Sequence, residues 1–409
     1  MGIVSALGNN VGETLAALQA QKSGIAPLRY LRTSHSQFPV GEVKMTDEEM
    51  IQLLKITEYE PTTRTSLMGM LALREALQHA KLRYATGRKS QIENRKPRIA
   101  FINGTTVGGM DKSEQFYLDF LENDTKNVYI STHDCGACTE MIADYFGIFS
   151  QVDTISTACS SAANAIILGA ELLKSGRADM VVAGGSECIT KFHLNGFNAL
   201  MILDREPCRP FDATRAGLNL GEGAAYLVMV REDKRYETCD CRISQIALSG
   251  YANTCDAYHQ TASSPDGEGA YLAMKKALEN AQLTPEQIDY INAHGTGTTN
   301  NDVSEGTAIV RLFGEKIPPV SSTKSFTGHT TSAAGSVEAI ISILALQHNF
   351  IPANLNFSEK MPELPFVPYS DMRGEIGDKQ QSQIELKHVL SNSFGFGGND
   401  TSLLFSKTQ

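Results

Sequence analysis

One cysteine lies at the boundary between two kinds of local sequence in the segment DTISTACSSAANAIILGAELL (153–173). Cys159 follows a short β-like run and precedes small and aliphatic residues, which are typical of a buried helix. A cysteine at a helix N-terminus has a lowered thiol pKa, and its thiolate can act as a nucleophile. Free cysteines are also common as packed core residues, so this segment alone leaves both interpretations open.

Two histidines lie in turns rich in glycine and threonine, where a ligand can approach the backbone. His294 follows a strand-like run in NAHGTGTTNND, and His329 precedes a helical segment in STKSFTGHTTSAAG. One cysteine and two imidazoles are sufficient for acyl transfer, because they supply a nucleophile and groups that polarise a carbonyl or move a proton. The glycine-rich run SFGFGG (393–398) would bring a backbone N–H close to a developing oxyanion.

Strand-like and helical runs alternate along the chain around these residues. The strand-like runs cover residues 98–104, 153–157, 179–185, 224–230, 242–250, 288–295, 318–324 and 385–398. The helical runs cover residues 64–82, 110–123, 159–175, 268–282, 303–313 and 332–348. This order predicts an α/β fold with largely buried strands. SAANAII (161–167) resembles SAAGSVEAII (332–341), which indicates a duplication, and REDKRYETCDC (231–241) is the expected hinge between the halves.

Composition restricts the class of protein. The chain has 409 residues and a net charge of −10, which argues against general nucleic-acid binding because that function needs a basic face. Eight scattered cysteines do not form a disulfide framework and favour a reducing compartment. The N-terminal sequence lacks the features of a signal peptide, and the longest apolar run, IISILAL (340–346), is too short to cross a bilayer. We therefore expect a soluble cytoplasmic protein that binds neither nucleic acid nor membrane.

Seven segments together resemble the β-ketoacyl-acyl-carrier-protein synthases, the condensing enzymes of the thiolase superfamily. They follow the family's order over essentially the whole chain: NGTTVGGM (103–110), TACSSAANA (157–165), CRPFDATRAGLNLGEGAAYLVM (208–229), DAYHQTASSPDG (256–267), NAHGTGTTNND (292–302), STKSFTGHTTSAAGSVEA (322–339) and SNSFGFGGND (391–400). The resemblance implies an α/β fold with a thiolase-like duplicated five-layered α-β-α-β-α architecture. It places the nucleophilic cysteine in an N-terminal half, residues 1–241, and both catalytic histidines in a C-terminal half, residues 242–409.

The resemblance implies a role for each residue that could do chemistry. Cys159 would accept an acyl group from a carrier-protein thioester, and the backbone N–H groups of Cys159 and Phe396 would form the oxyanion hole. His294 and His329 would promote decarboxylation of a malonyl thioester and hold the enolate oxygen. The enolate carbon would then attack the acyl-enzyme.

Four further residues match supporting positions of the family. Lys324 and Glu338 match a pair that would order the His329 loop without touching substrate. Thr296 and Thr298 match threonines that hydrogen-bond the phosphopantetheine arm. No metal or redox cofactor is implied, because the loss of carbon dioxide generates the carbanion and the substrates are carried on the phosphopantetheine of acyl carrier protein.

The resemblance places the acyl pocket between the cysteine and a dimer interface. Its implied lining includes Val107, Phe396 and the segment YISTHDCGACTEM (129–141). Asp134 and its small neighbours replace the bulky aliphatic residues that suit a saturated chain, where each buried methylene gains roughly 0.8 kcal/mol. This departure favours a partly polar or conjugated chain, although pairing of Asp134 with His133 or an arginine is also open.

The implied reaction is the decarboxylative Claisen condensation of an acyl group on Cys159 with malonyl-acyl-carrier protein, giving 3-oxoacyl-acyl-carrier protein and carbon dioxide in fatty-acid elongation. The alternative is a specialised ketosynthase of an aryl-polyene or type II polyketide pathway. A non-catalytic chain-length-factor subunit would lack Cys159, and a degradative thiolase would have a second cysteine near SNSFGFGGND. A metal or redox site at HDCGAC (133–138) or CDC (239–241) lacks four well-spaced ligands.

Acyl carrier protein and a second subunit are the implied partners. The second subunit would be another copy of the chain or a chain-length-factor-like protein. The family's basic docking cluster before residues 64–82 is reduced here to Arg64. Docking would then rely on other basic residues, namely Arg205, Arg209, and Lys174 or Arg177. The arginines in RPFDATR are equally suited to internal ion pairs.

The N-terminal sequence carries a last expectation. Family members have a β-strand ending in Thr-Gly just before a sequence like MGIVSALGNN. The first sheet is therefore expected to lack one strand, and about five to ten further residues are expected upstream.

Overall fold

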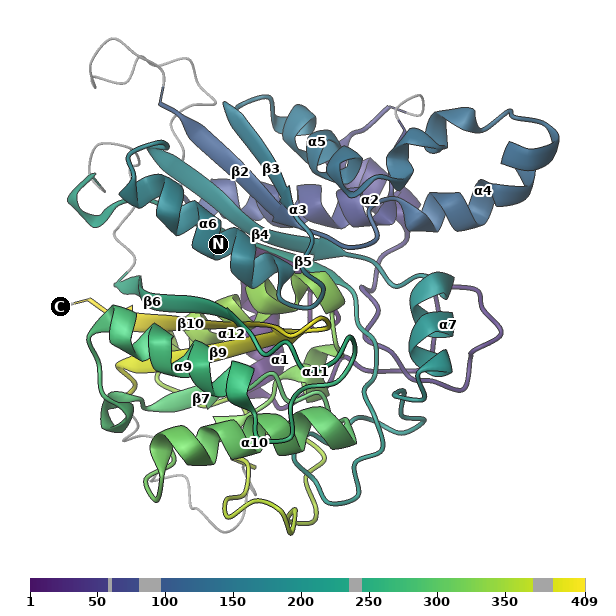
Figure 1. Ribbon diagram of the computed structural model, residues 1–409. Helices are drawn as coiled ribbons and strands as arrows, with labels where there is room; N and C mark the ends of the chain where they lie inside the picture. Colours follow the sequence, from purple (N-terminus) through teal and green to yellow (C-terminus); the bar gives the residue numbers. More distant parts are fainter. Residues whose placement is uncertain (58–60, 81–96, 235–244, 371–384, 409) are drawn as a thin grey trace.

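The computed structural model describes residues 1–57, 61–80, 97–234, 245–370 and 385–408 (Figure 1). Two five-stranded mixed sheets form its framework, with strand orders β1-β5-β4-β2-β3 and β6-β10-β9-β7-β8. The first sheet contains β1 (Gly2–Ser5), β2 (Ile99–Gly104), β3 (Gln151–Ile155), β4 (Met180–Glu187) and β5 (Gly223–Met229). The second contains β6 (Ile246–Cys255), β7 (Tyr290–Asn292), β8 (Val320–Ser321), β9 (His388–Gly395) and β10 (Asn399–Lys407).

The two sheets repeat one pairing pattern. In the first, β2 pairs in parallel with β3 and β4, whereas β5 pairs antiparallel with β4 and β1. In the second, β7 pairs in parallel with β8 and β9, whereas β10 pairs antiparallel with β9 and β6. The same order of parallel and antiparallel neighbours in both sheets confirms the duplicated architecture that the sequence predicted.

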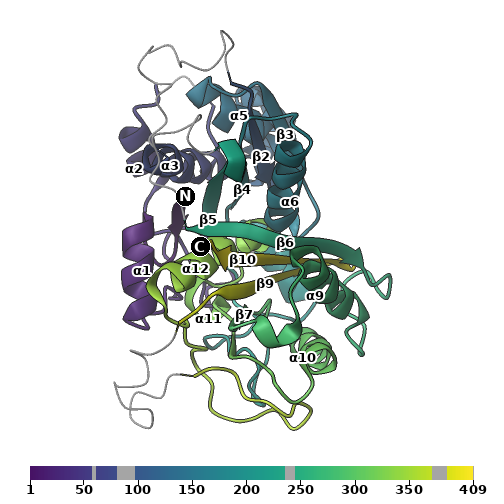
Figure 2. The ribbon, with the colours of Figure 1, turned by 90° about the vertical axis from the view of Figure 1, so that its left-hand side faces the viewer.

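Helices complete five layers (Figures 1 and 2). The outer face of the first sheet is covered by α3 (Arg64–His79) and α5 (Cys135–Phe146), and the outer side of the second by α9 (Glu268–Ala281) and α10 (Thr299–Phe313). Between the sheets lie α6 (Ser161–Lys174) and α12 (Ala334–His348), which pack against each other. The other α-helices of the described ranges are α1 (Val11–Gln19), α2 (Asp47–Leu54), α4 (Met110–Glu122), α7 (Lys191–Ala199) and α11 (Lys324–Thr327).

The middle layer explains why two segments of the sequence are apolar nearly all round. Every residue of α12 from Ala334 to Leu346 is buried, as expected for a helix enclosed between two sheets. Gly335 lies against α6, where an added Cβ would stand 2.7 Å from the backbone nitrogen of Ala163. The largest apolar cluster includes Ile166 of α6 and Ile341 of α12, so both sheets share one core.

Several expected boundaries were wrong. The expected helix 159–175 begins at Ser161, so Cys159 lies in the turn before it. The expected strand 318–324 shrinks to Val320–Ser321, because Lys324 already begins α11. The first sheet does not lack a strand, since Gly2–Ser5 forms its edge strand. Whether residues precede Met1 stays a prediction.

Two other expectations concern the hinge between the predicted halves and the lack of a membrane-spanning segment. Residues 235–241 of the expected hinge, and the boundary at 241–242, lie outside the described residues, so the two-part division stays a prediction. Throughout the described ranges, no helix is both long enough and apolar enough to cross a membrane.

Candidate active site

Cys159 occupies a strained turn between β3 and α6. Ala158 has φ 53°, in the left-handed region that a residue with a side chain adopts only when its surroundings hold it there. Two serine hydroxyls hold this turn: Ser160 Oγ donates to the Thr157 carbonyl at 2.7 Å, and Ser161 Oγ donates to the Ala158 carbonyl at 2.6 Å. The turn therefore presents Cys159 at a fixed position, and the residue is only 6% exposed.

The two predicted histidines meet this cysteine from the other sheet. His329, between α11 and α12, places Nε2 3.1 Å from Cys159 Sγ. His294 follows β7, and its ring centroid lies 5.3 Å from that of His329, with the two planes at 85°. Both histidines are buried. Three residues separated by up to 170 positions are thus brought together by elements of both sheets.

The buried ion pair of Lys324 and Glu338 sets the tautomer of one histidine. Lys324 Nζ lies 3.2 Å from His294 Nδ1 and also bonds Glu338. An ammonium group has no acceptor, so His294 Nδ1 must accept this hydrogen bond and the ring proton must be on Nε2. The family resemblance predicted that this pair orders the His329 loop, whereas the structure places Lys324 directly against His294.

Both imidazoles are uncharged. Burial, followed by the positive charge of Lys324, lowers the pKa of His294 and of His329 well below the ordinary histidine value. The site therefore offers two neutral rings at neutral pH. A neutral ring can donate a hydrogen bond from its one N–H and accept a hydrogen bond or a proton at its other nitrogen.

Burial has the opposite effect on the thiol. It raises the pKa of Cys159 to about 11, although Lys324 and a hydrogen bond from the Phe396 backbone oppose this shift. The sequence predicted a thiolate favoured by a helix N-terminus, but the loss of hydration outweighs that effect here. Cys159 is accordingly a protonated thiol at rest, with His329 Nε2 within proton-transfer distance.

The glycine-rich loop after β9 closes the site as expected. The Phe396 backbone N–H bonds the Cys159 sulfur. Gly395 makes this approach possible, because a Cβ there would lie 2.9 Å from the Thr157 carbonyl and 3.3 Å from the Cys159 nitrogen. The oxyanion-hole role of the Cys159 and Phe396 N–H groups stays a prediction, and the geometry agrees with it.

The predicted pantetheine threonines line the same cavity as the cysteine and the histidines. Thr296 and Thr298 bond each other through their hydroxyls at 2.8 Å. The cavity of about 100 Å³ is also lined by Phe197, Ile202, Leu218, Thr261, Ala262, Ser263, Thr299, Asn300, Asn301, Phe394 and the loop 395–398. Its rim of hydroxyl and amide groups suits a polar arm that leads to a buried thioester.

Two of the expected acyl-pocket residues have other contacts. Val107 is buried in the core cluster beneath α3 and α5 and does not line the described cavity. Asp134 is exposed and caps α5, where Oδ1 accepts from the Gly136 N–H at 2.6 Å. Nor does Asp134 pair with His133, whose Nδ1 lies 2.8 Å from Ser113 Oγ. Phe396, the third expected residue, does line the cavity.

Sequence reasoning missed the residue that holds the His294 turn. Glu305, on α10, accepts the backbone N–H groups of His294 and Gly295, both at 2.8 Å. It is 1% exposed. The available signal was an acidic side chain at helical spacing with the apolar residues Ala308 and Ile309, a pattern that places a carboxylate on a buried face.

The proposed docking residues divide into internal and surface groups. Arg64 is enclosed, with Nη2 2.6 Å from Glu222 and Nη1 2.9 Å from Asp47. Arg209 pairs with Asp204 at 2.8 Å. Of the two roles considered for the arginines of RPFDATR, docking or an internal ion pair, Arg209 therefore has the second. Three of the candidates remain exposed: Lys174, Arg177 and Arg205.

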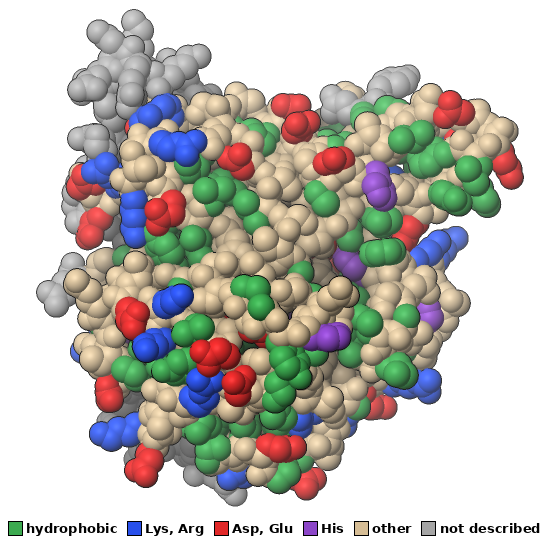
Figure 3. All heavy atoms as spheres, viewed as in Figure 1, with side chains coloured by type: hydrophobic (Ala, Val, Ile, Leu, Met, Phe, Trp, Pro, Cys, Tyr) green, Lys and Arg blue, Asp and Glu red, His purple; other side chains and the backbone are tan. Residues whose placement is uncertain are grey.

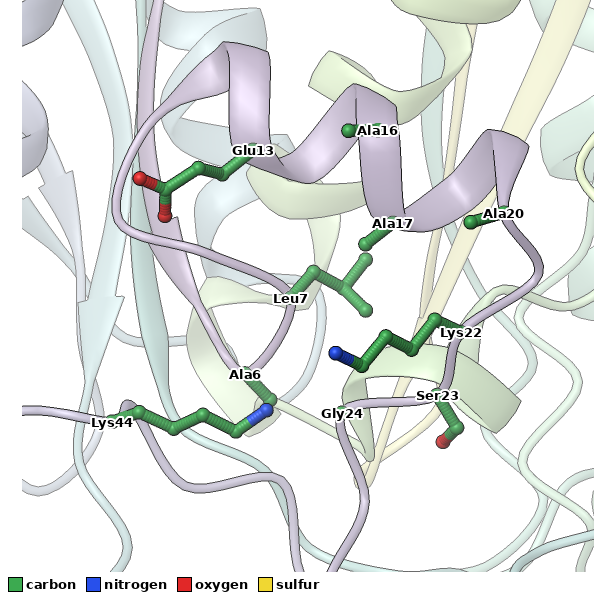
Figure 4. A pocket seen from close by; sticks show the side chains of 10 residues that line it. All are labelled: Ala6, Leu7, Glu13, Ala16, Ala17, Ala20, Lys22, Ser23, Gly24 and Lys44. Carbon is green, nitrogen blue, oxygen red and sulfur yellow. The ribbon is translucent and has the colours of Figure 1, made fainter.

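A second hollow, of about 300 Å³, lies beside α1 (Figure 4). The alanines of α1 and Leu7 form its wall, and the Lys22 and Lys44 side chains extend along it (Figure 4). It contains neither cysteine nor histidine and is no candidate for acyl transfer. Within the described ranges no three histidine, cysteine or acidic side chains gather as a metal site, while the CDC segment (239–241) lies outside those ranges.

A buried carboxylate behind the site gives a prediction about stability. Burial and the negative charges of Asp256 and Glu305 raise the pKa of Asp400 to about 8. In the unfolded chain the same carboxyl group has a pKa near 3.8, so the folded protein binds this proton more tightly than the unfolded chain does. This difference stabilises the folded state fully below about pH 4, and the stabilisation is lost as the pH rises through 8. Asp400→Asn should therefore raise the melting temperature by about 2 °C or more at pH 8, with a gain that disappears toward pH 4.

Thermal unfolding between pH 4 and 8 measures this effect. Asp266→Asn, at an exposed position, is the matched control and should leave the melting temperature unchanged. An Asp400→Asn gain that is the same at every pH would contradict the assigned pKa.

Comparison with known proteins agrees with this geometry. The family model described as the N-terminal domain of beta-ketoacyl synthase matches residues 1–235, and the one described as its C-terminal domain matches residues 246–358. A 3-oxoacyl-[acyl-carrier-protein] synthase 2 of Coxiella burnetii is 33% identical, and the alignment covers 100% of this chain and 97% of the relative. The protein of the same name from Vibrio cholerae is also 33% identical, with the same coverage.

Two solved structures are similar over the whole chain. The ketosynthase ApeO of Xenorhabdus doucetiae, in complex with its chain length factor ApeC, gives a TM-score of 0.83 at 31% identity, covering 100% of this chain and 96% of the other. The ishigamide ketosynthase/chain length factor gives 0.85 at 26% identity, covering 100% and 98%.

Proposed function

Because this chain belongs to the β-ketoacyl synthase family, we propose that it is an acyltransferase that condenses an acyl group on Cys159 with malonyl-acyl-carrier protein. The products are 3-oxoacyl-acyl-carrier protein and carbon dioxide, as in fatty-acid elongation. The observation that carries the proposal is the convergence of Cys159 Sγ, His329 Nε2 and the His294 ring in one cavity. The similarity to 3-oxoacyl-[acyl-carrier-protein] synthases 2 supports the same reaction.

The first half of the proposed reaction acylates the cysteine. The Cys159 thiol gives its proton to His329 Nε2, 3.1 Å away, as the sulfur attacks the thioester carbonyl. The N–H groups of Cys159 and Phe396 bind the resulting oxyanion. The bond to the pantetheine sulfur then breaks, and that sulfur takes the proton from His329.

The second half forms the carbon–carbon bond. His294 donates its Nε2–H to the oxygen of a malonyl thioester, and the neutral His329 ring lies beside it. Carbon dioxide leaves, and the enolate carbon attacks the acyl carbonyl on Cys159. The carbon–sulfur bond to Cys159 breaks, and the thiolate takes up one proton from solvent, which replaces the proton that left on the pantetheine sulfur. No metal or redox cofactor is needed in this scheme, because decarboxylation supplies the electron pair.

Product analysis tests this proposal. Purified protein is incubated with malonyl-acyl-carrier protein and a series of acyl-carrier-protein primers, and mass spectrometry follows the products. Each accepted primer should return as a 3-oxoacyl thioester with two more carbons. Absence of product with every primer would contradict the proposal.

A specialised ketosynthase is the second candidate function. The similarity to ApeO and to the ishigamide ketosynthase favours it. Saturated and polyunsaturated primers of equal length separate the two candidates in the same assay. Preference for the saturated chain supports fatty-acid elongation, and preference for the polyunsaturated chain supports the specialised role.

The proposed partners are acyl carrier protein and a second subunit of the same fold, either a copy of this chain or a chain-length-factor-like protein. Arg205 is the docking candidate with a link to the site, because it is exposed and lies three residues after Ile202, which lines the cavity. We also propose a cytoplasmic location, in keeping with the absence of disulfides among the six cysteines in the described ranges.

The dimer proposal rests on an apolar surface over α4 (Figure 3). Tyr117, Leu118 and Leu121 are 61%, 68% and 67% exposed, which is unusual for a run of large apolar side chains on one helix. The ketosynthase ApeO was solved with a second subunit. Leu118→Asp is expected to raise the dissociation constant of the dimer at least tenfold, since a charge would be buried at the interface.

Light scattering across a dilution series measures the dimer. Leu53→Asp replaces an exposed leucine of α2, at 51% exposure, and should leave the mass unchanged. If Leu118→Asp has the same mass as the unmodified protein at every concentration, the interface lies elsewhere.

A further inference from the structure

One asparagine of the second sheet is bonded to the turn that carries Cys159. Asn399 is the first residue of β10, and its side-chain oxygen Oδ1 accepts a hydrogen bond from Ser160 Oγ at 2.7 Å. The same oxygen accepts from Nδ2 of Asn164, in the first turn of α6, also at 2.7 Å. Ser160 and Asn164 follow β3 of the first sheet, whereas Asn399 belongs to a strand of the second. The Asn399 side chain therefore joins elements of both sheets next to the reacting cysteine.

Further hydrogen bonds hold the Asn399 side chain in one orientation. Asn253, on the neighbouring strand β6, donates from Nδ2 to Asn399 Oδ1 at 2.7 Å and to Thr401 Oγ1 at 2.9 Å. Asn164 Nδ2 also donates to Thr157 Oγ1 at 2.9 Å, so the network reaches the residues on both sides of the cysteine. Three donors thus converge on one carbonyl oxygen, which must point toward the cysteine turn to accept them.

Asn399 also closes the loop that carries the Phe396 N–H. β9 ends at Gly395, which pairs with Asn399, and the residues between them form a tight turn. Within this turn the Gly398 N–H bonds the Gly395 carbonyl at 3.1 Å, and Gly397 and Gly398 have φ values of 83° and 74°. Glycines allow this backbone path but offer no side chain that could hold the loop against the cysteine turn. The Asn399 side chain supplies such a contact at the end of the loop.

We propose that Asn399 is a positioning residue that holds the backbone N–H groups of Cys159 and Phe396 in register as one oxyanion hole. This inference rests on the proposed function. Asn399 does not line the cavity, so it acts through the two backbone segments that it joins. One donor is next to Ser160, which bonds Asn399, and the other is in the loop that ends at Asn399. Such donors act on a developing oxyanion only when both are correctly placed, and a displacement of about 1 Å is costly.

Two reactions of the same sulfur test the inference. Acylation by octanoyl-acyl-carrier protein passes through an oxyanion, whereas alkylation by iodoacetamide displaces iodide from a saturated carbon and forms none. Peptide mass spectrometry follows both adducts at Cys159. Asn399→Ala should lower the ratio of the acylation rate to the alkylation rate about tenfold or more. Asn399→Asp keeps an oxygen that accepts the same bonds, and its charge affects the thiol in both reactions, so it should preserve most of the ratio.

Asn280→Ala is the matched control and should leave the ratio unchanged, because the Asn280 side chain also bonds β6, at the Tyr251 N–H, but does not line the cavity. An Asn399→Ala ratio equal to that of the unmodified protein overturns the inference, and so does an Asn399→Asp ratio as low as that of Asn399→Ala.

A second variant keeps the inference testable if Asn399→Ala does not fold. Asn164→Ala removes one donor of the same bridge and should lower the ratio about threefold or more, so an unchanged ratio in this variant then overturns the inference. Alkylation of the unmodified protein without acylation by any primer would instead refute the proposed function on which the inference rests.

Discussion

Cys159→Ala is expected to reduce condensation by a factor on the order of 10⁴ or more, because the variant has no atom that can form the acyl thioester. The substitution removes one buried sulfur and leaves the Phe396 N–H and the His329 ring in place. Decarboxylation of malonyl-acyl-carrier protein should therefore persist, since His294, which holds the enolate oxygen, and the neighbouring His329 are unchanged. Intact-protein mass spectrometry should detect no acyl adduct on the variant.

Cys208→Ala is the matched control for this experiment. Cys208 is also buried, and its sulfur lies 3.4 Å from the Lys324 carbonyl, close to the same ion pair. Burial raises its pKa to about 12, and unlike Cys159 it does not line the cavity. This variant should acylate and condense normally. An acyl group on any other cysteine of the Cys159→Ala protein would show that the nucleophile is misassigned.

His294→Ala should reduce decarboxylation on the order of a hundredfold or more, the usual cost of removing one preorganised donor to a developing oxyanion. Lys324 fixes the His294 proton on Nε2, so the donor is aligned before substrate arrives. Acylation of Cys159 should persist in this variant, because the base that contacts the sulfur is His329 and not His294. His329→Ala should slow both half-reactions, since its ring lies against both the sulfur and His294.

Separate assays of carbon dioxide release and of acyl-enzyme formation distinguish these two effects. His348→Ala, on the surface, provides the matched control. A role limited to bracing the loops would appear as a lower melting temperature with a nearly normal rate. Near-normal decarboxylation by His294→Ala would remove that residue from the mechanism.

The sequence was sufficient for the parts of the site that depend on local pattern. The similar segments at 161–167 and 332–341 predicted a duplication, and they form the paired helices α6 and α12. Glycine-rich turns next to strands drew attention to His294 and to the loop of Phe396, which line the same cavity. These features could be predicted because backbone access and helical burial leave clear traces in residue type and spacing.

Other features depend on neighbours that are distant in the sequence. Lys324 contacts His294 across 30 positions, and no local pattern indicates which histidine it supports. The raised pKa of Cys159 follows from its burial by segments that are distant in the sequence, which a helix N-terminus alone could not reveal. Asp134 looked like part of a tunnel wall, but it satisfies the N-terminus of α5 instead. In each case, tertiary packing decides the outcome.

The shared middle layer has a consequence for how such a chain can change over time. Only glycine fits at position 335, because Ala163 of α6 stands where a Cβ would collide. A substitution on one side of this layer therefore constrains what the other side can accept. The two repeats have to co-vary as a pair, and chimaeras that exchange one repeat between distant relatives should fold poorly unless α6 and α12 are transferred together.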